Sequence, residues 1–327
     1  MNKQNCISIT GGTGHLGTGL IQLLLEKGFH VKALHYNSKP RIEHPNLKWI
    51  KGKVTDTDCI RNLIADSTVL VHSAAIISIG DKNKNLVFDT NVNGTKTVIK
   101  ICSEGNIKFI YISSSTAVKE TIGTEIFDEN RPYKTEKDFL YGYTKALSEQ
   151  LIIKAISQHK LHGHIIRPTS IIGPPDYNVS HFGQTVLDMH SGKIPAITKG
   201  GYNLVDVRDL SQTIINSFSL GENGDIYLVG GHYYSLKDIA HMANSDKKPL
   251  NIPLDILIVL APIISLIVKI VPMKWPVTKE SLLLLKRAPK HVDSTKAIKK
   301  LNHESRPTQE SITDLISWYE KQRLNET

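Results

Sequence analysis

The chain has 327 residues, of which 40% are hydrophobic and 22% charged, and its formal net charge is +9. This composition excludes an intrinsically disordered chain, and the length suits one large α/β domain with a smaller appended region. The positive charge is concentrated in residues 254–300, which carry nine Lys or Arg and three acids. Such an excess of positive charge usually reflects solvated lysines on the surface, and the alternative is attraction to an anionic partner. We expect no nucleic-acid partner.

Three cysteines, Cys6, Cys59 and Cys102, are an odd number without metal-ligand spacing. We therefore expect neither a disulfide framework nor a metal site. Cys6 and Cys102 stand in apolar surroundings that are typical of small core residues. The first nine residues enter a strand pattern directly, without the basic and apolar segments of a signal peptide, so the expected location is the cytoplasm.

Short apolar runs alternate with longer stretches of helical spacing through the first half of the chain. The predicted strands are residues 6–10, 30–35, 47–50, 68–72, 109–113 and 164–167, and the predicted helices are residues 16–27, 58–64, 86–103 and 143–159. Continuous apolar runs suit parallel strands that are covered on both faces. The expected fold class is therefore α/β, with a doubly wound parallel sheet.

A glycine-rich motif, Thr10-Gly11-Gly12-Thr13-Gly14-His15-Leu16-Gly17, follows the first strand and opens the first helix. Gly11 permits a tight turn, Gly14 lets the backbone approach a pyrophosphate, and Gly17 allows close packing of helix and strand. The free N–H groups of the helix N-terminus suit phosphates. This position favours a dinucleotide site over a merely structural turn.

These elements predict the domain organisation. Residues 1–172 are expected to form a dinucleotide-binding Rossmann domain, with further core elements returning around residues 202–230. The pattern loosens after Gly173, so residues 173–327 are expected to be mainly a substrate-binding and C-terminal helical region.

The end of the second strand carries His35-Tyr36-Asn37, where an NAD enzyme usually has Asp or Glu. The missing carboxylate removes a repulsion from a 2′-phosphate, and Lys32, Lys39 and Arg41 stand close by in the sequence. NADP is therefore favoured as the cofactor, with NAD as the alternative.

The pattern Tyr-x-x-x-Lys occurs three times, beginning at Tyr133, Tyr141 and Tyr233. Only Tyr141 and Lys145 run into a long helix that leads to the next core strand. Spacing of four places both side chains on one helix face. A close Lys145 would favour the phenolate and lower the pKa of Tyr141 from about 10, which would prepare it as a general acid or base.

A polar run, Ser113-Ser114-Ser115-Thr116, ends the fifth predicted strand. Ligands of an open parallel sheet lie off the carboxyl ends of its strands. A serine there can hydrogen-bond the reacting oxygen, and the alternative is a turn whose serines satisfy backbone groups.

Six motifs stand in a fixed order over roughly residues 6–245. They are the glycine-rich motif, His72-Ser73-Ala74-Ala75, Asn91-Val92-Asn93-Gly94-Thr95, Tyr111-Ile112-Ser113-Ser114, Tyr141-Gly142-Tyr143-Thr144-Lys145 and Arg167-Pro168-Thr169. The set resembles the extended short-chain dehydrogenases/reductases. That family includes nucleotide-sugar epimerases, dihydroflavonol 4-reductases and 3β-hydroxysteroid dehydrogenases.

The resemblance implies roles for individual residues. Ser114 would be the catalytic serine, with Ser115 as its nearest competitor, Tyr141 the acid/base, and Lys145 a ligand of the nicotinamide ribose. The expected cofactor-binding set is Gly11, Thr13, Gly14, His15, Leu16, Gly17, His35, Tyr36, Val54, Ala74, Ala75, Asn91, Ser113, Tyr141, Lys145, Pro168 and Ser170.

Departures from the family pattern favour the reductase and hydroxysteroid dehydrogenase branch. Many sugar epimerases have Tyr-Gly where Val118-Lys119 stand and a nucleotide-contacting Asn at the position of Ser170. The acids of the dehydratases are absent after the serine run, and Lys53 replaces an Asp that often precedes the adenine contact.

The sequence thus predicts an NAD(P)-dependent oxidoreductase that interconverts a carbonyl and an alcohol on a small, apolar substrate. A nucleotide-sugar epimerase and a catalytically silent NAD(P)-sensing protein are the alternatives.

The C-terminal region contains residues 256–268, a run without charge that is too short for an ordinary membrane span. Trp275 and a leucine cluster at 282–285 follow it. Buried helices of the substrate region are the first expectation. Weak membrane-surface association through residues 254–290 and an apolar homodimer face are the alternatives.

Overall fold

The computed structural model describes residues 5–78, 83–121, 124–244, 246, 249–253, 256 and 279–326. Within these ranges, a seven-stranded parallel sheet forms the centre of the larger part of the molecule, in the order β10-β6-β5-β4-β1-β2-β3. Its strands are β1 (Cys6–Thr10), β2 (His30–His35), β3 (Leu47–Lys51), β4 (Val69–His72), β5 (Lys108–Ile112), β6 (Gly163–Pro168) and β10 (Ile226–Val229). The predicted doubly wound α/β fold is confirmed.

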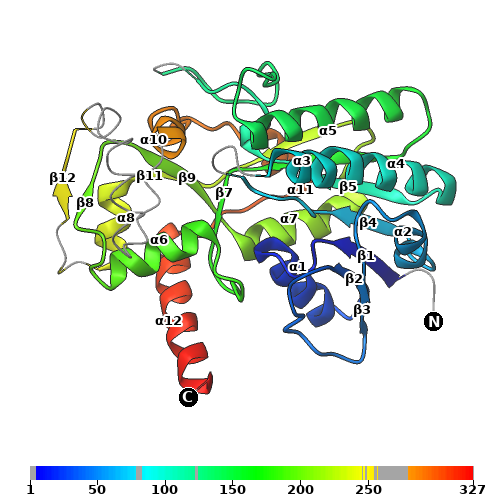
Figure 1. Cartoon of the computed structure of the whole chain (residues 1–327), viewed down its shortest axis with the longest axis horizontal. Coiled ribbons are helices and arrows are strands. Elements are labelled where there is room, and N and C mark those ends of the chain that lie inside the picture. Colours follow the sequence, from blue (N-terminus) through cyan, green and yellow to red (C-terminus); the bar gives the residue numbers. More distant parts are fainter. Residues whose placement is uncertain are drawn as a thin grey trace.

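Helices cover both faces of this sheet, as the continuous apolar strands require (Figure 1). One face packs against α1 (His15–Glu26), α7 (Val207–Leu220) and α11 (Thr295–Leu301), and the other against α2 (Thr57–Ile64), α4 (Gly94–Gly105) and α5 (Leu140–Ser157). In β5, Ile110 and Ile112 enter the first core, whereas Phe109 and Tyr111 enter the second. The strand is therefore buried on both sides.

The strand order reverses between β1 and β4, the two neighbours at the centre of the sheet. Because all seven strands are parallel, their carboxyl ends meet at one edge, and the crevice of such a fold opens where the order reverses. Short elements follow at this edge: α3 (Lys84–Phe88) and the π-helical turn η2 (Asp89–Asn93) after β4, and the 3₁₀ turn η3 (Ser115–Ala117) after β5. The helix predicted over 86–103 is thus α3, η2 and α4 in succession.

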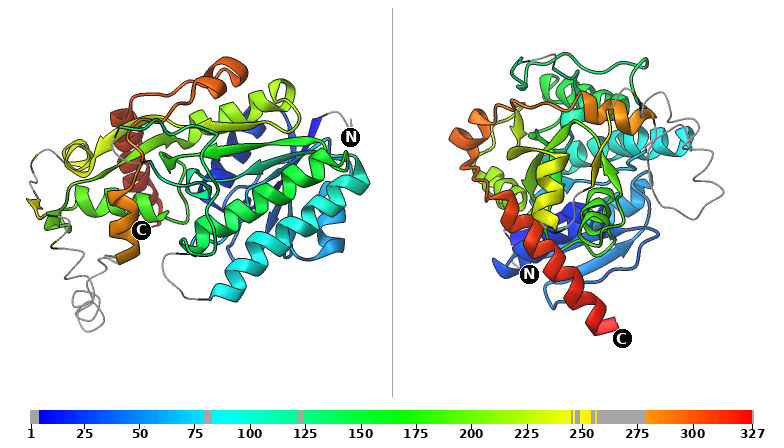
Figure 2. Two further views of the ribbon diagram at one scale, coloured as in Figure 1. Left: turned by 90° about the horizontal axis from the view of Figure 1, so that it is seen from above. Right: turned by 90° about the vertical axis from the view of Figure 1, so that its left-hand side faces the viewer.

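A second group of elements lies to one side of the main sheet (Figures 1 and 2). It comprises the sheet of β7 (Ser170–Ile172), β9 (Gly201–Asp206) and β11 (His232–Ser235), the pair β8 (Ala196–Ile197) and β12 (Leu250–Asn251), and the helices α6 (His181–His190), α8 (Leu236–Ala243), α10 (Lys279–Lys286) and α12 (Thr308–Glu326). An apolar cluster joins α6, α8, α10 and α12 to β9. The C-terminal end of α12 projects from the body.

Most of the apolar run at 256–268, and Trp275, lie outside the described residues. In α10, Leu282 and Leu285 are buried, and Leu285 packs in the cluster with α6, α8 and α12. This part of the leucine cluster therefore belongs to the core. Among the described residues, no helix combines the length and apolar character needed to cross a membrane.

The cysteines follow the sequence prediction. Cys6 and Cys102 are buried, Cys59 is partly buried, and all three are free thiols. Burial raises the pKa of Cys59, and the negative charge of Asp56 adds to the effect. Burial also raises the pKa of Cys102, and a thiol that stays protonated is a poor nucleophile.

Candidate active site

Glycines let the glycine-rich turn pack closely against the neighbouring backbone at the start of α1. Gly11 adopts φ +73°, and a Cβ there would meet the backbone of Ala74 at 2.8 Å. A Cβ at Gly17 would collide with the carbonyl oxygen of Gly11. Gly14 is exposed and begins α1, which has neither a side-chain cap nor an acid in its first turn. The first N–H groups of α1 are thus left for an anion, which fits a dinucleotide pyrophosphate.

A buried chain of hydrogen bonds ties this turn to the neighbouring strand end. Thr10 Oγ1 lies 2.6 Å from Nδ1 of His72, and Nε2 of His72 lies 3.0 Å from Thr95 Oγ1. Because the Thr95 hydroxyl donates to the carbonyl of Asn91 at 2.6 Å, it accepts from His72, so the ring proton is on Nε2. Burial lowers the pKa of His72 to about 3, with the charge of Lys145 as a smaller cause. The imidazole is therefore neutral and fixed in one tautomer.

Asn91 completes this framework. Its side chain is buried, its Oδ1 accepts from the backbone of Ile76 at 2.8 Å, and its Nδ2 donates to Ile76 and to Thr144 Oγ1 at 3.1 and 3.0 Å. The amide therefore joins the segment after β4 to α5. Both polar atoms of the Asn91 side chain, a predicted cofactor-binding residue, are thus hydrogen-bonded within the protein, where they join Ile76 to α5.

The structure brings Ser114, Tyr141 and Lys145 together. Tyr141 lies in the first turn of α5, one turn before Lys145, and the nearby Ser114 side chain lowers the pKa of its hydroxyl against the larger effect of burial. The Ser114 oxygen accepts two bonds from Thr116, from the backbone N at 3.2 Å and from the hydroxyl at 2.9 Å. Its own proton is therefore available for Tyr141 or a reacting oxygen.

Lys145, one turn after Tyr141 on α5, is buried. Its Nζ donates to the carbonyl of Ile112 at 2.8 Å and lies 4.7 Å from the ring centre of Tyr111. Burial lowers the pKa of Lys145 to about 7, although Glu149 opposes the shift. The same cause raises the pKa of Tyr141 to about 12, against the weaker effect of Ser114. The expected lowering of the Tyr141 pKa by Lys145 is therefore wrong for this structure, because desolvation dominates and the only opposing cause is the Ser114 side chain.

Two buried hydroxyls after neighbouring strands have no hydrogen-bond partner among the described residues. Ser113 Oγ follows β5 and Thr169 Oγ1 follows β6, and neither has a hydrogen bond to any described residue. Buried polar atoms in native proteins are nearly always paired, so orphaned hydroxyls at the carboxyl ends of adjacent strands fit a polar ligand. The predicted residues Pro168 and Ser170 flank Thr169, Pro168 buried and Ser170 partly exposed.

His35, Tyr36 and Lys53 stand where the sequence predicts the adenosine end of the cofactor. Tyr36 is 48% exposed, and the Lys53 ammonium lies 5.3 Å from its ring centre. His35 stands edge-on to Trp49, and its Nδ1 is buried without a hydrogen-bond partner among the described residues. Val54 is buried, and its side chain packs so closely on Gly94 that a Cβ there would collide with it. Lys32, a cation invoked for this end from the sequence, donates instead to the carbonyl of Ala65 and pairs with Asp66.

Sequence reasoning missed the contacts that the segment after β7 makes with the glycine-rich turn. His15 Nε2 donates to the carbonyl of Gly173 at 2.7 Å, and Asn178 Nδ2 donates to the carbonyl of Thr13 at 2.7 Å. The partners are separated by more than 150 residues, so no local spacing could indicate them. Leu16, a predicted cofactor-binding residue, buries its side chain in the core.

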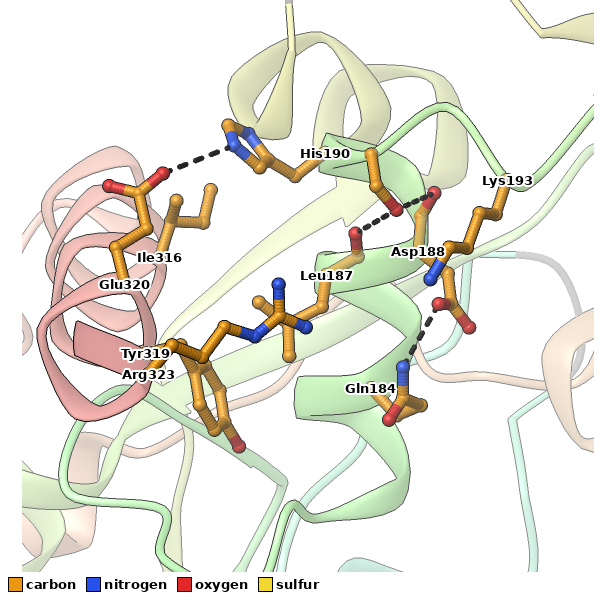
Figure 3. Close-up of a pocket in the computed structure, with 10 residues that line it drawn as sticks. Gln184, Leu187, Asp188, His190, Lys193, Ile316, Tyr319, Glu320 and Arg323 are labelled. Atoms are coloured by element: carbon orange, nitrogen blue, oxygen red, sulfur yellow. Dashed lines mark hydrogen bonds and ion pairs between the residues drawn. The ribbon is translucent and has the colours of Figure 1, made fainter. Parts of the chain in front are cut away.

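Two hollows lie away from these residues. One, of about 260 Å³, lies between α6 and α12 and includes the ion pair of His190 with Glu320 at 3.6 Å (Figure 3). The other, of about 530 Å³, lies between α4 and α5. Neither includes a predicted site residue. Within the described ranges, no group of three or more His, Cys, Asp or Glu side chains is placed to hold a metal ion.

Comparison with known proteins gives the family. Residues 8–235 match the 3-beta hydroxysteroid dehydrogenase/isomerase family. The chain is 26% identical to a putative dihydroflavonol 4-reductase of Synechocystis over 97% of its own length and 95% of the relative's. It is also 26% identical to sterol demethylase protein B of Methylococcus capsulatus, covering 97% of this chain and 98% of the relative.

Among solved structures, the crystal structure of gox2253 superposes with a TM-score of 0.83 at 26% identity, over 97% of this chain and 98% of that chain. The matched residues include the glycine-rich turn, the serine run and the Tyr141–Lys145 pair. The chain belongs to the 3-beta hydroxysteroid dehydrogenase/isomerase family of extended short-chain oxidoreductases, whose members use NAD(P).

Proposed function

We propose that this chain is an NAD(P)-dependent oxidoreductase that interconverts a secondary alcohol and a ketone on an apolar substrate, with Tyr141 as the general acid/base. The observation that carries the proposal is the convergence of Ser114, Tyr141 and Lys145 beside the unpartnered hydroxyls of Ser113 and Thr169. The names of the relatives in Synechocystis and Methylococcus support a flavonol-like or sterol-like polycyclic alcohol as the substrate class.

The glycine-rich turn, Ala74, Ala75 and the hydroxyls after β5 and β6 would hold the dinucleotide along the carboxyl edge of the sheet. When bound, the dinucleotide supplies or accepts the hydride. In the domain division that we propose, residues 1–172 bind it, with β10 completing the sheet, and residues 173–327 mainly bind the substrate. NADP is the favoured form because no carboxylate stands at His35 or Tyr36, and Lys53 lies beside Tyr36.

The chain's own residues handle the proton. In the reductive direction the Tyr141 hydroxyl donates its proton to the carbonyl oxygen, and in the oxidative direction the tyrosine receives the proton of the alcohol. Burial raises the pKa of Tyr141 to about 12, which suits a donor that stays protonated at neutral pH. Ser114 donates a hydrogen bond to the same oxygen, and Lys145, fixed by Ile112, stands ready to offer its remaining N–H groups to the ribose.

Purified protein mixed with NADPH or NADH and a panel of 3-ketosteroids, dihydroflavonols and simple ketones tests the proposal. We expect oxidation of NADPH, seen as loss of absorbance at the nicotinamide band, with at least one polycyclic ketone. Turnover of a nucleotide sugar without net change of the nicotinamide would instead establish the epimerase. Binding of NADPH without turnover of any compound would favour the cofactor-sensing alternative.

Two partner predictions accompany this proposal. Residues 254–290 carry an apolar run among basic residues, so we expect weak binding to anionic vesicles that fades with salt. Co-sedimentation with phosphatidylserine vesicles at low salt checks this, and absence of binding there would contradict it.

A homodimer is the second prediction, and sedimentation velocity measures the oligomeric state.

A further inference from the structure

The connection between β7 and α6, residues 173–180, lies against the glycine-rich turn and is here called the strap. Gly173 and Asn178 of the strap contact His15 and Thr13, the two residues that flank Gly14, each through one hydrogen bond of 2.7 Å. These bonds cross from the smaller group of elements to the predicted pyrophosphate site. The position of the turn therefore depends on the position of the strap.

The C-terminal helix holds the strap from its other side. Asp176 of the strap is 1% exposed, and its carboxylate accepts bonds from the backbone and hydroxyl of Ser180 at 2.8 and 2.7 Å. Tyr319 of α12 directs its hydroxyl to the same carboxylate at 2.9 Å and to the Asp176 carbonyl at 3.0 Å. The ring of Trp318 packs edge-on against Tyr177 at 5.0 Å.

The helix is itself fixed to the body of the molecule. Asp314 of α12 pairs with Arg208 at 2.7 Å, and Arg208 also pairs with the buried Asp206 at 2.7 Å. Figure 3 shows the Tyr319 side chain between α12 and α6. Burial together with the negative charge of Asp176 raises the pKa of Tyr319, so the phenol remains a hydrogen-bond donor. A continuous set of contacts thus runs from α7 through α12 and the strap to Thr13.

We propose that Asn178 and Tyr319 are positioning residues for cofactor binding: Tyr319 fixes the strap, and Asn178 transmits that constraint to the turn that receives the pyrophosphate. The inference rests on the proposed function, because it takes the glycine-rich turn as the dinucleotide site. Pre-oriented N–H groups at the start of α1 bind an anion without a further cost of ordering the turn. Loss of either contact lets the turn move and weakens binding of the cofactor.

Asn178→Ala and Tyr319→Phe in the full-length chain test this. We expect each to raise the dissociation constant for NADPH about threefold to tenfold, the range for one hydrogen bond, with kcat at saturating cofactor changed less than twofold. Titration calorimetry gives the dissociation constants, and circular dichroism checks the fold. Glu320→Gln is the matched control, because Glu320 neighbours Tyr319 on α12 but pairs with His190 outside the strap. It should bind NADPH as the natural protein does.

The double variant Asn178→Ala/Tyr319→Phe shows whether the two residues act on cofactor binding through the same contacts or independently. If Tyr319 acts through the strap, the double variant weakens binding no more than about as much as the stronger single variant. Full multiplication of the two effects, or unchanged NADPH binding in both single variants, would overturn the inference. Failure of the natural protein to bind NADPH or NADH at all would overturn the proposed function instead.

Discussion

At the scale of single residues, the candidate site depends on side chains whose protonation is set by burial more than by nearby charges. Tyr141, Lys145 and His72 all have pKa values moved toward their neutral forms, and desolvation is the largest cause for each. The sequence predicts Tyr141 and Lys145 as site residues because, of three such patterns, only this pair begins a long helix that leads to a core strand. It could not give their protonation, which depends on the depth at which α5 packs.

Removal of one hydroxyl tests the acid/base role. We expect Tyr141→Phe to reduce kcat by about 10²–10⁴-fold, since the proton donor is lost, while the dissociation constant for NADPH stays within about twofold. Steady-state kinetics and calorimetry provide the two values. Tyr143→Phe, two residues along α5, is the matched control and should retain turnover. Natural rates in Tyr141→Phe would refute the assignment.

The choice of cofactor is a second property of single residues. His35→Asp places a carboxylate at the end of β2, where it offers a partner to ribose hydroxyls and repels a 2′-phosphate. We expect the ratio of kcat/KM for NADPH over NADH to fall by about tenfold or more, measured with the same substrate. His44→Asp is the matched control, because His44 lies just before β3, at the amino ends of the strands. This variant should leave the ratio unaltered. A natural protein that already prefers NADH tenfold would contradict the NADP prediction.

At the scale of elements, the first six strands of the sheet lie within one residue of their predicted bounds, because short continuous apolar runs bounded by turn residues are typical of buried parallel strands. Elements defined by long-range contacts were not predictable. The π-helical turn η2 lies inside a continuous helical pattern, and β11 pairs antiparallel with β9 through Tyr233 and Tyr234, whose local pattern is weak. The strap's contacts with Thr13 and His15 are of the same kind.

A buried ion pair joins two of these elements. Arg167 of β6 holds Glu149 of α5 through two bonds of 3.1 and 2.6 Å, and both side chains are fully buried. Arg167 also donates to the carbonyl of Glu129, whose side chain accepts from the backbone of Leu228 in β10. The pair therefore connects α5, the loop before it and the edge of the sheet.

Replacing only one partner of this ion pair should lower the free energy of unfolding more than replacing both partners. Arg167→Met leaves a buried carboxylate without its cation, and we expect a loss of about 3–5 kcal/mol in the free energy of unfolding, measured by urea denaturation. Arg167→Met combined with Glu149→Met should be less destabilised than Arg167→Met alone. Losses that simply add would show that the charge left behind is not the main cost.

At the scale of the whole molecule, two buried histidines make the free energy of unfolding depend on pH. Burial lowers the pKa of both His72 and His164 to about 3, whereas an imidazole in the unfolded chain titrates near 6.5. Between these values the unfolded state binds protons that the folded state excludes. The free energy of unfolding therefore falls as the pH drops from about 6.5 toward 3, and each histidine accounts for about 2 kcal/mol of the loss at pH 5.

The two histidines differ in their surroundings, which separates their effects. His72 joins Thr10 to Thr95, whereas neither ring nitrogen of His164 has a hydrogen-bond partner among the described residues, and its ring stands edge-on to Tyr227. His164→Phe keeps the ring and removes the titrating group, so we expect unchanged or higher stability at pH 7 and a shallower loss between pH 7 and pH 5. His72→Phe removes two buried hydrogen bonds and should already be destabilised at pH 7. Urea denaturation at each pH measures both, and parallel curves for His164→Phe and the natural protein would show that His164 does not cause the acid sensitivity.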